Sequence, residues 1–235
     1  MQLTGPEILR RMQDKDKPDI VIKPFDIRCL GPNSYDLHLA DKLRVYKHTV
    51  PKGTKPAIPY KGDLDMHQMK DWFENTTAYA NYCRTPGDFD PRNPRFLIDP
   101  TNPAHHETID IKIPETGLVL SPYIGYLGST VEYTETHNLI PHIDGKSSVG
   151  RNFIINHFTA GRGDDGFCGD WTLEIRVMYP TVVYPYMRIG QIYYEEIVGE
   201  RLPYNKIESS HYNGQRGPTA AAPIPVDKFL KEKVR

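Results

Sequence analysis

The chain has 235 residues and a formal net charge of −1 at pH 7, with 38% hydrophobic and 25% charged residues. This near-neutral balance argues against a broad electrostatic surface for nucleic acid, so we expect no nucleic-acid partner. No apolar run approaches the roughly 18 residues that a membrane-spanning helix needs, and the N-terminus lacks the apolar core of a signal peptide. We therefore expect a cytoplasmic protein with no membrane partner.

The cysteine, proline and glycine content narrows the class further. The chain has three cysteines, Cys29, Cys83 and Cys168, and no CxxC pair. An odd number of widely spaced cysteines argues against a disulfide framework and favours a reducing compartment. With 21 Pro, 18 Gly and 15 Tyr, the composition favours short strands joined by turns. The sequence therefore predicts a mainly β protein.

The periodicity predicts one short helix followed by many strands. Thr4, Pro6 and Glu7 form a helix-start signal, which predicts a helix over residues 5–14. Alternating or short apolar runs predict strands at residues 20–22, 35–39, 43–46, 109–113, 118–120, 123–134, 139–142, 172–177, 181–184 and 187–194.

Two segments depart from the strand pattern. Residues 48–107 are rich in Pro, Gly, Asp and Asn, with one possible helix around residues 65–75, and they predict a loop-rich insertion of unknown role. Regularity also fades after residue 200. We expect residues 218–235 to be a flexible C-terminal tail, and the alternative for this region is a lid that closes over a ligand.

The segment 144–175 carries the strongest chemical signal. Gly145, Lys146, Ser147 and Ser148 supply the backbone freedom and the donors of a phosphate cradle. Further along, Glu174 alternates with apolar residues of a predicted strand, so it lies on the face opposite to them. An anion site, the acidic turn at residues 164–166 and a carboxylate together indicate nucleotide chemistry.

A zinc deaminase would need a different signature. Residues 105–107 read His-His-Glu and match HxE, but no CxxC follows to supply the remaining ligands. We interpret the match as chance and expect no zinc and no metal ligand from the protein. A metal-free deamination then requires a carboxylate that moves protons, and Glu174 suits this role.

Several motifs in one order resemble a known family. They are NSYDLHL (33–39), GKSSVGR (145–151), TAGRGDDGF (159–167), TLEI (172–175), MRIGQI (187–192) and GQRGPT (214–219). Together they look like the dCTP deaminase family of the dUTPase-fold superfamily, closest to the bifunctional dCTP deaminase/dUTPase type. The resemblance covers residues 1–47 loosely and 108–220 closely, and leaves 48–107 unaccounted for.

The resemblance implies a fold and an assembly. It implies a dUTPase-like distorted jelly-roll β-barrel formed by residues 1–47 and 108–217, with one short N-terminal helix and the insertion. It also implies a homotrimer with active sites at the subunit interfaces, and dTTP as a possible feedback inhibitor.

The resemblance also implies residue roles. Glu174 matches the catalytic glutamate, Ser147 and Arg151 match residues that orient the water and stabilise the attacked base, and Asp164 matches an aspartate near the sugar that is tied to phosphate hydrolysis. The implied substrate-binding residues are Lys146, Ser148, Val149, Gly150, Gly161, Thr172, Leu173, Gln191, Tyr204, His211 and Gln215. Mg²⁺ is expected to arrive with the nucleotide triphosphate, mostly through water.

Gly161 favours the bifunctional activity, because TAG at residues 159–161 is typical of members that also hydrolyse the triphosphate. We therefore expect dCTP to give dUMP, ammonia and pyrophosphate, for thymidylate synthesis. Arg162, Asp165 and His211 depart from the bifunctional pattern and leave open a relaxed preference for dCMP or dUTP. The alternatives are a deaminase that stops at dUTP, a dUTPase alone, and a non-catalytic nucleotide-binding regulator.

Overall fold

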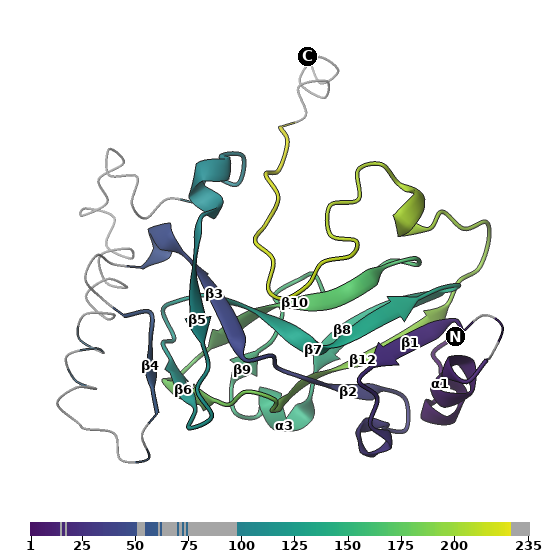
Figure 1. The fold of residues 1–235 in the computed structure, drawn as a ribbon, viewed down its shortest axis with the longest axis horizontal. Helices are drawn as coiled ribbons and strands as arrows, with labels where there is room; N and C mark the ends of the chain where they lie inside the picture. Colours follow the sequence, from purple (N-terminus) through teal and green to yellow (C-terminus); the bar gives the residue numbers. More distant parts are fainter. Residues whose placement is uncertain are drawn as a thin grey trace.

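The computed structural model describes residues 1–14, 16, 18–50, 55–60, 62, 70, 72, 74 and 98–226, most of which lie in strands and loops (Figure 1). The strands are β1 (Ile20–Lys23), β2 (Tyr35–His38), β3 (Lys42–Tyr46), β4 (Ala57–Pro59), β5 (Thr108–Lys112), β6 (Leu118–Leu120), β7 (Tyr126–Thr136), β8 (Leu139–Gly145), β9 (Ile154–Ile155), β10 (Cys168–Val177), β11 (Thr181–Val183) and β12 (Arg188–Glu196). The helices whose bounds are described are α1 (Gly5–Met12) and α3 (Ser147–Gly150), with 3-10 turns η1 (Ile27–Cys29), η2 (Lys47–Thr49), η4 (Pro103–His106) and η5 (Tyr204–Lys206).

The strands form antiparallel sheets that curl around a common core. The largest sheet has the order β5-β3-β7-β10-β9, with β1 also paired to β7, and the smaller sheets have the orders β11-β6-β4 and β2-β12-β8. Figure 1 shows α1 beside β1 at one end of this arrangement. The predictions of a mainly β, jelly-roll-like fold and of one short N-terminal helix are confirmed.

Strand β10 lies between β7 and β9 in the largest sheet and sets the position of the predicted catalytic glutamate. Leu173 and Ile175 are buried at 1% and 0% exposure and face the core. Because side chains alternate along a strand, Glu174 and Thr172 point to the other face. The strand begins at Cys168, earlier than predicted, with a register shift between Asp170 and Thr172 against β7.

Buried tyrosines explain part of the unusual aromatic content. Tyr35, Tyr126 and Tyr194 are among the largest fully buried side chains. The Tyr126 hydroxyl donates to the Pro56 carbonyl at 2.6 Å and accepts the Ser121 N–H at 2.8 Å. A ring thus fills the core while its polar end is satisfied, and burial raises the pKa of the Tyr126 phenol.

The segments predicted to be irregular contain some local order. Inside the predicted insertion, β4 pairs with β6, with Ala57 opposite Leu120. The helix predicted around residues 65–75 lies mostly outside the described residues. At the C-terminus, the Thr219 and Ala221 N–H groups donate to side chains of β10 and β3, and the Ile224 N–H donates to the Pro100 carbonyl at 2.8 Å. Among the described residues, no helix is long and apolar enough to cross a membrane.

Candidate active site

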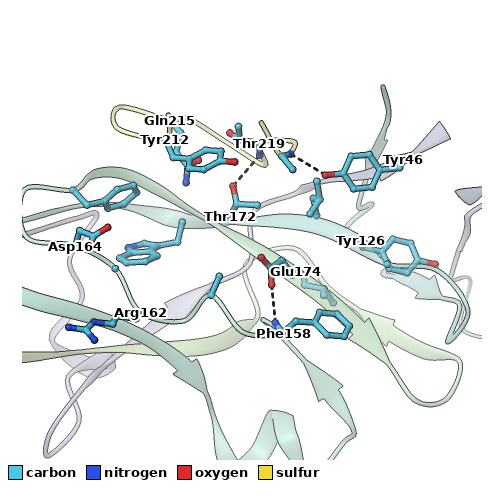
Figure 2. Close-up of a pocket in the computed structure, with 18 of the residues that line it drawn as sticks. Tyr46, Tyr126, Phe158, Arg162, Asp164, Thr172, Glu174, Tyr212, Gln215 and Thr219 are labelled. Carbon is cyan, nitrogen blue, oxygen red and sulfur yellow. Dashed lines mark hydrogen bonds between the residues drawn. The ribbon is translucent and has the colours of Figure 1, made fainter. Parts of the chain in front are cut away.

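A cavity of about 710 Å³ lies over β10 and is covered by the C-terminal segment (Figure 2). Its polar lining includes the predicted residues Asp164, Thr172, Glu174, Tyr204 and Gln215. Its apolar wall includes the aromatic side chains of Tyr126, Phe158, Phe167, Trp171 and Tyr212. An apolar pocket with a few convergent polar groups is the usual form of a small-molecule site.

Glu174 lies in the middle of this cavity on the outer face of β10. Its Oε2 atom accepts the Phe158 N–H at 2.9 Å, which fixes the carboxylate against the segment that leads into the 159–167 loop (Figure 2). Its neighbour across the sheet is Leu127 of β7. The side chain is only half exposed. A carboxylate so held, with apolar neighbours that limit water, is suited to transfer protons to and from a bound base.

The two adjacent aspartates of the acidic turn have different environments. Asp165 is buried at 7% exposure, where its Oδ1 accepts the Asn138 N–H at 2.7 Å and its Oδ2 accepts Arg201 Nε at 2.8 Å. This carboxylate holds the turn in place. Asp164 is exposed and lines the cavity. The turn therefore presents one carboxylate to a ligand and uses the other as an anchor.

The C-terminal segment is bound along β10 by backbone and side-chain hydrogen bonds. The Asp170 N–H donates to the Gln215 carbonyl at 3.0 Å, and Gln215 Nε2 donates to the Asp170 carbonyl at 2.7 Å. Further on, the Thr219 N–H donates to Thr172 Oγ1 at 3.1 Å (Figure 2). The segment therefore forms the roof of the cavity and brings Gln215 over β10.

A second group of predicted residues lies away from this cavity. Figure 1 shows α3 and the C-terminal segment on opposite sides of the main sheet. On α3 and just after it, Ser147, Ser148, Gly150 and Arg151 are exposed, while Val149 is buried at 5% exposure. None of these residues lines the cavity of this single chain.

The residues beside α3 are engaged in a polar cluster. Lys146 Nζ donates to the Asp36 carboxylate at 2.7 and 2.8 Å, and Arg188 donates to the same carboxylate at 3.0 Å. Gln191 Nε2 donates to the Gly145 carbonyl at 3.0 Å and its Oε1 accepts the Ser34 hydroxyl at 2.9 Å. Lys146 and Gln191 thus lie together, on the α3 side of the molecule.

Three further predicted residues also lie outside the cavity lining. Leu173 faces the core, and His211 is exposed beside Tyr212, with ring centroids 6.2 Å apart. Gly161 is buried, and a Cβ there would lie 2.4 Å from the Ile143 carbonyl oxygen. The backbone contact alone therefore requires glycine at this position.

The structure also shows the positions of two sequence features without a predicted catalytic or binding role, the HxE match and Arg162. His105 of the HxE match accepts the Asp99 N–H on its Nδ1 at 2.9 Å and so closes a turn. Arg162, a departure from the bifunctional pattern, lines the cavity, and its backbone forms an isolated antiparallel β-bridge with His142. A cationic side chain thus stands at the cavity.

Sequence reasoning missed most of the aromatic wall and one polar contact. Tyr46 lines the cavity, and its hydroxyl accepts the Ala221 N–H at 3.1 Å (Figure 2). Phe158 and Trp171, which also line the cavity, are not among the predicted residues. The available signal was that aromatic residues immediately precede the motifs TAGRGDDGF and TLEI.

The geometry defines a class of protein: a curled β-sheet protein with a cavity of small-molecule size between strand β10 and its own C-terminal segment. Comparisons identify the family. The dCTP deaminase-like family model matches residues 80–197. The dCTP deaminase, dUMP-forming, of Leptospira biflexa is 37% identical over 217 residues, which are 92% of this chain and 92% of the relative. The protein of the same name from Cytophaga hutchinsonii is 37% identical over 92% of this chain and 93% of the relative.

The family model and these relatives show that the chain belongs to the dCTP deaminase-like family. Among solved structures, the 2'-deoxycytidine 5'-triphosphate deaminase from Agrobacterium tumefaciens matches 82% of this chain and 47% of that chain, at 18% identity and a TM-score of 0.48.

Proposed function

We propose that this protein converts dCTP to dUMP in two hydrolytic steps. In the first step dCTP and water give dUTP and ammonia, and in the second dUTP and water give dUMP and pyrophosphate. The observation that carries the proposal is Glu174 in an apolar cavity, in a chain whose relatives are named for this reaction. The product dUMP would serve thymidylate synthesis.

Glu174 is assigned the proton transfers of deamination. It takes a proton from a water as that water attacks C4 of the cytosine ring, and it delivers this proton to N3. The amino group then leaves as ammonia after a further proton transfer. The bond from the Phe158 N–H fixes one carboxylate oxygen, so that the carboxylate is oriented before the base binds.

Asp164 is assigned to the hydrolysis of the triphosphate. Its exposed carboxylate lines the same cavity, on the loop that precedes β10, whereas Glu174 lies on β10 itself (Figure 2). It would orient a second water for attack at the α-phosphate, with pyrophosphate as the leaving group. Mg²⁺ enters as part of the nucleotide substrate, where it offsets the phosphate charge, and the protein supplies no ligand to it in this proposal.

The complete site is proposed to form between two copies in a homotrimer. Ser147 and Arg151 would reach the cavity of a neighbouring copy, because they lie on the opposite side of their own sheet. An exposed apolar group beside α3 supports such a contact, since Phe153 and Tyr179 are 49% and 59% exposed and touch edge to face at 5.5 Å. A second copy would cover it.

The remaining expectations are retained as parts of the proposal. Residues 1–47 and 108–217 would form the catalytic domain, and residues 48–107 an insertion. dTTP, which is dUTP with a methyl group on the ring, would occupy the same site as a feedback inhibitor. A cytoplasmic location fits the odd number of cysteines.

The test is to incubate the protein with dCTP and Mg²⁺, with zinc selectively chelated, and to resolve the products by ion-exchange chromatography. The proposal predicts dUMP. Accumulation of dUTP alone would identify a deaminase without the second step. Intact dCTP, with dUTP hydrolysed when it is offered, would identify a dUTPase. No turnover of either nucleotide would identify a regulator, and each of these three outcomes overturns the proposal.

A further inference from the structure

Three potential metal ligands gather at one end of the β7–β10 pair, outside the cavity. They are Glu135 of β7, His137 just after it, and Cys168 at the start of β10. Cys168 is the register partner of Glu135, so the sheet itself places the thiol beside the carboxylate. The ligand atoms of all three lie within 4.8 Å of one another. None of the three lines the cavity that holds Glu174.

The spacing is close to that of a tetrahedral metal site. His137 Nε2 and Glu135 Oε2 are 3.5 Å apart. Two ligands of a tetrahedral zinc ion, at bond lengths of roughly 2.0 to 2.3 Å, are separated by about 3.5 Å. The pair is therefore already at the required distance, and the Cys168 sulfur lies within 4.8 Å of the ligand atoms of both. The burial of all three side chains is intermediate, so an ion has access from solvent.

The carboxylate is oriented by a neighbour that is not itself a ligand. The Tyr133 hydroxyl donates to Glu135 Oε1 at 3.0 Å, which leaves Oε2 directed to His137. The Tyr133 ring is in turn covered by the Arg216 guanidinium, 4.9 Å from its centroid. Metal sites commonly hold their ligands through such outer partners.

We propose that Glu135, His137 and Cys168 bind a thiophilic divalent cation of the zinc class, with a water in the fourth position. A thiolate, an imidazole and a carboxylate form a donor set that zinc accepts and that magnesium and calcium do not. The site is separate from the cavity of the proposed reaction, so it does not depend on the deaminase assignment. It would be a structural site, and it would overturn the expectation that the protein supplies no metal ligand.

The ion would stabilise the place where the C-terminal segment attaches. The Cys168 N–H donates to Asn213 Oδ1 at 2.9 Å, and the Cys168 carbonyl accepts the Gly214 N–H at 2.6 Å. Gln215, the next residue, lines the cavity. Fixing the Cys168 side chain would therefore restrain the strand end from which the roof of the cavity is held.

The experiment uses Co²⁺ as a spectroscopic probe and Zn²⁺ for affinity, on full-length protein stripped with a chelator. We expect a thiolate-to-cobalt absorption band that saturates at one ion per chain and is displaced by Zn²⁺. The band should vanish in Cys168→Ser and persist in Cys83→Ser, a matched thiol control. His137→Gln should weaken Zn²⁺ binding, and Tyr133→Phe should weaken it about tenfold by releasing the Glu135 carboxylate.

Two results would overturn the proposal. One is the absence of a thiolate band in the wild-type protein, and the other is a band that survives in Cys168→Ser. Circular dichroism of each variant shows whether the fold is intact. If Cys168→Ser does not fold, Tyr133→Phe decides alone, because it keeps all three ligands, and unchanged Zn²⁺ affinity in that variant would then contradict the site.

Discussion

On β10, the residues on one face form part of the core, and those on the other face line the proposed active site. Leu173 and Ile175 are buried in the core, while Thr172 and Glu174 face the cavity. The period-two alternation in the sequence is sufficient to predict this division. Alternation cannot distinguish the two aspartates of the acidic turn. Asp164 and Asp165 are adjacent in the sequence, and they differ only in the hydrogen-bond partners that the fold brings to them.

The difference between these aspartates predicts a separation of the two proposed steps. Asp164→Asn should leave ammonia release from dCTP within about threefold of wild type and slow triphosphate hydrolysis by roughly 100-fold or more, because the second water loses its orienting carboxylate. Product analysis should then show dUTP in place of dUMP. Asp165→Asn is the control and should lower stability by about 1–3 kcal/mol without changing the product ratio. An unchanged yield of dUMP in Asp164→Asn would remove its assigned role.

At the scale of elements, the C-terminal segment is held on the sheet by a small number of hydrogen bonds. Their partners lie on β3 and β10, far away in the sequence, for example Tyr46 with Ala221. Composition alone left a flexible tail and a lid as alternatives, because it contains no information on such distant acceptors. β4 and β9 are absent from the predicted strands. β4 lies within the Pro- and Gly-rich segment 48–107, which was assigned to a loop-rich insertion, and the two residues of β9 are too few to display a period.

The acceptors on the sheet predict how easily this segment opens. Thr172→Val and Tyr46→Phe each remove one acceptor while keeping the shape of the side chain, at a cost of about 1 kcal/mol. Hydrogen exchange of the amides of Thr219 and Ala221, respectively, should become about fivefold faster. Tyr60→Phe serves as the control, because the Tyr60 hydroxyl donates to the Gly62 carbonyl at 3.1 Å and not to the C-terminal segment. Exchange rates that do not respond to either change would show that other contacts hold the segment.

The N-terminal helix is attached through a charged network with a defined pH dependence. Hydrogen bonds from Arg10 and Arg11 lower the pKa of Glu7 from 4.5 to about 2. Arg11 also bonds Asp19 and Glu196, at 3.1 Å each, and so connects α1 to the end of β12. Because the folded-state pKa is depressed, the stabilisation is present above about pH 4.5 and is lost as the pH falls towards 2.

Thermal unfolding across this range tests the network. Glu7→Gln should melt at a lower temperature than wild type at pH 6, and the gap should close as the pH approaches 2. Glu208→Gln removes an exposed glutamate outside the network and should show no such trend. A gap of constant size at every pH would contradict the assignment of the effect to ionised Glu7.

At the scale of the whole molecule, the curled β architecture follows from the strand pattern, but the arrangement of the site does not. In the sequence, the GKSSVGR run (145–151) comes shortly before Glu174. In the fold, α3 and the cavity that holds Glu174 lie on opposite sides of the sheet. The predicted residues therefore separate into a group around Glu174 and a group around α3. In the proposed homotrimer a neighbouring copy would bring the two groups together, and no pattern within one chain specifies the geometry of such an assembly.

Assemblies that mix two variants test whether Glu174 of one copy acts together with Arg151 of another. Glu174→Gln and Arg151→Ala should each be inactive alone, since each removes one half of the site. Co-expressed at equal levels, they should recover activity at about a quarter of the interfaces, where an intact Glu174 meets an intact Arg151. Deaminase assays on the purified mixture measure this recovery. A mixture as inactive as its components would mean that each site is formed within a single chain.

The most direct test of the proposed reaction is its stoichiometry with dCTP as the only nucleotide. Ammonia, pyrophosphate and dUMP are measured together in wild type and in Glu174→Gln, after confirming that the variant still binds dCTP. The account predicts equimolar amounts of all three products from wild type. It predicts that ammonia release falls by about 10²–10⁴-fold in the variant, in line with the loss of a general acid–base. Undiminished ammonia release by Glu174→Gln, or dCTP left intact by wild type, would contradict it.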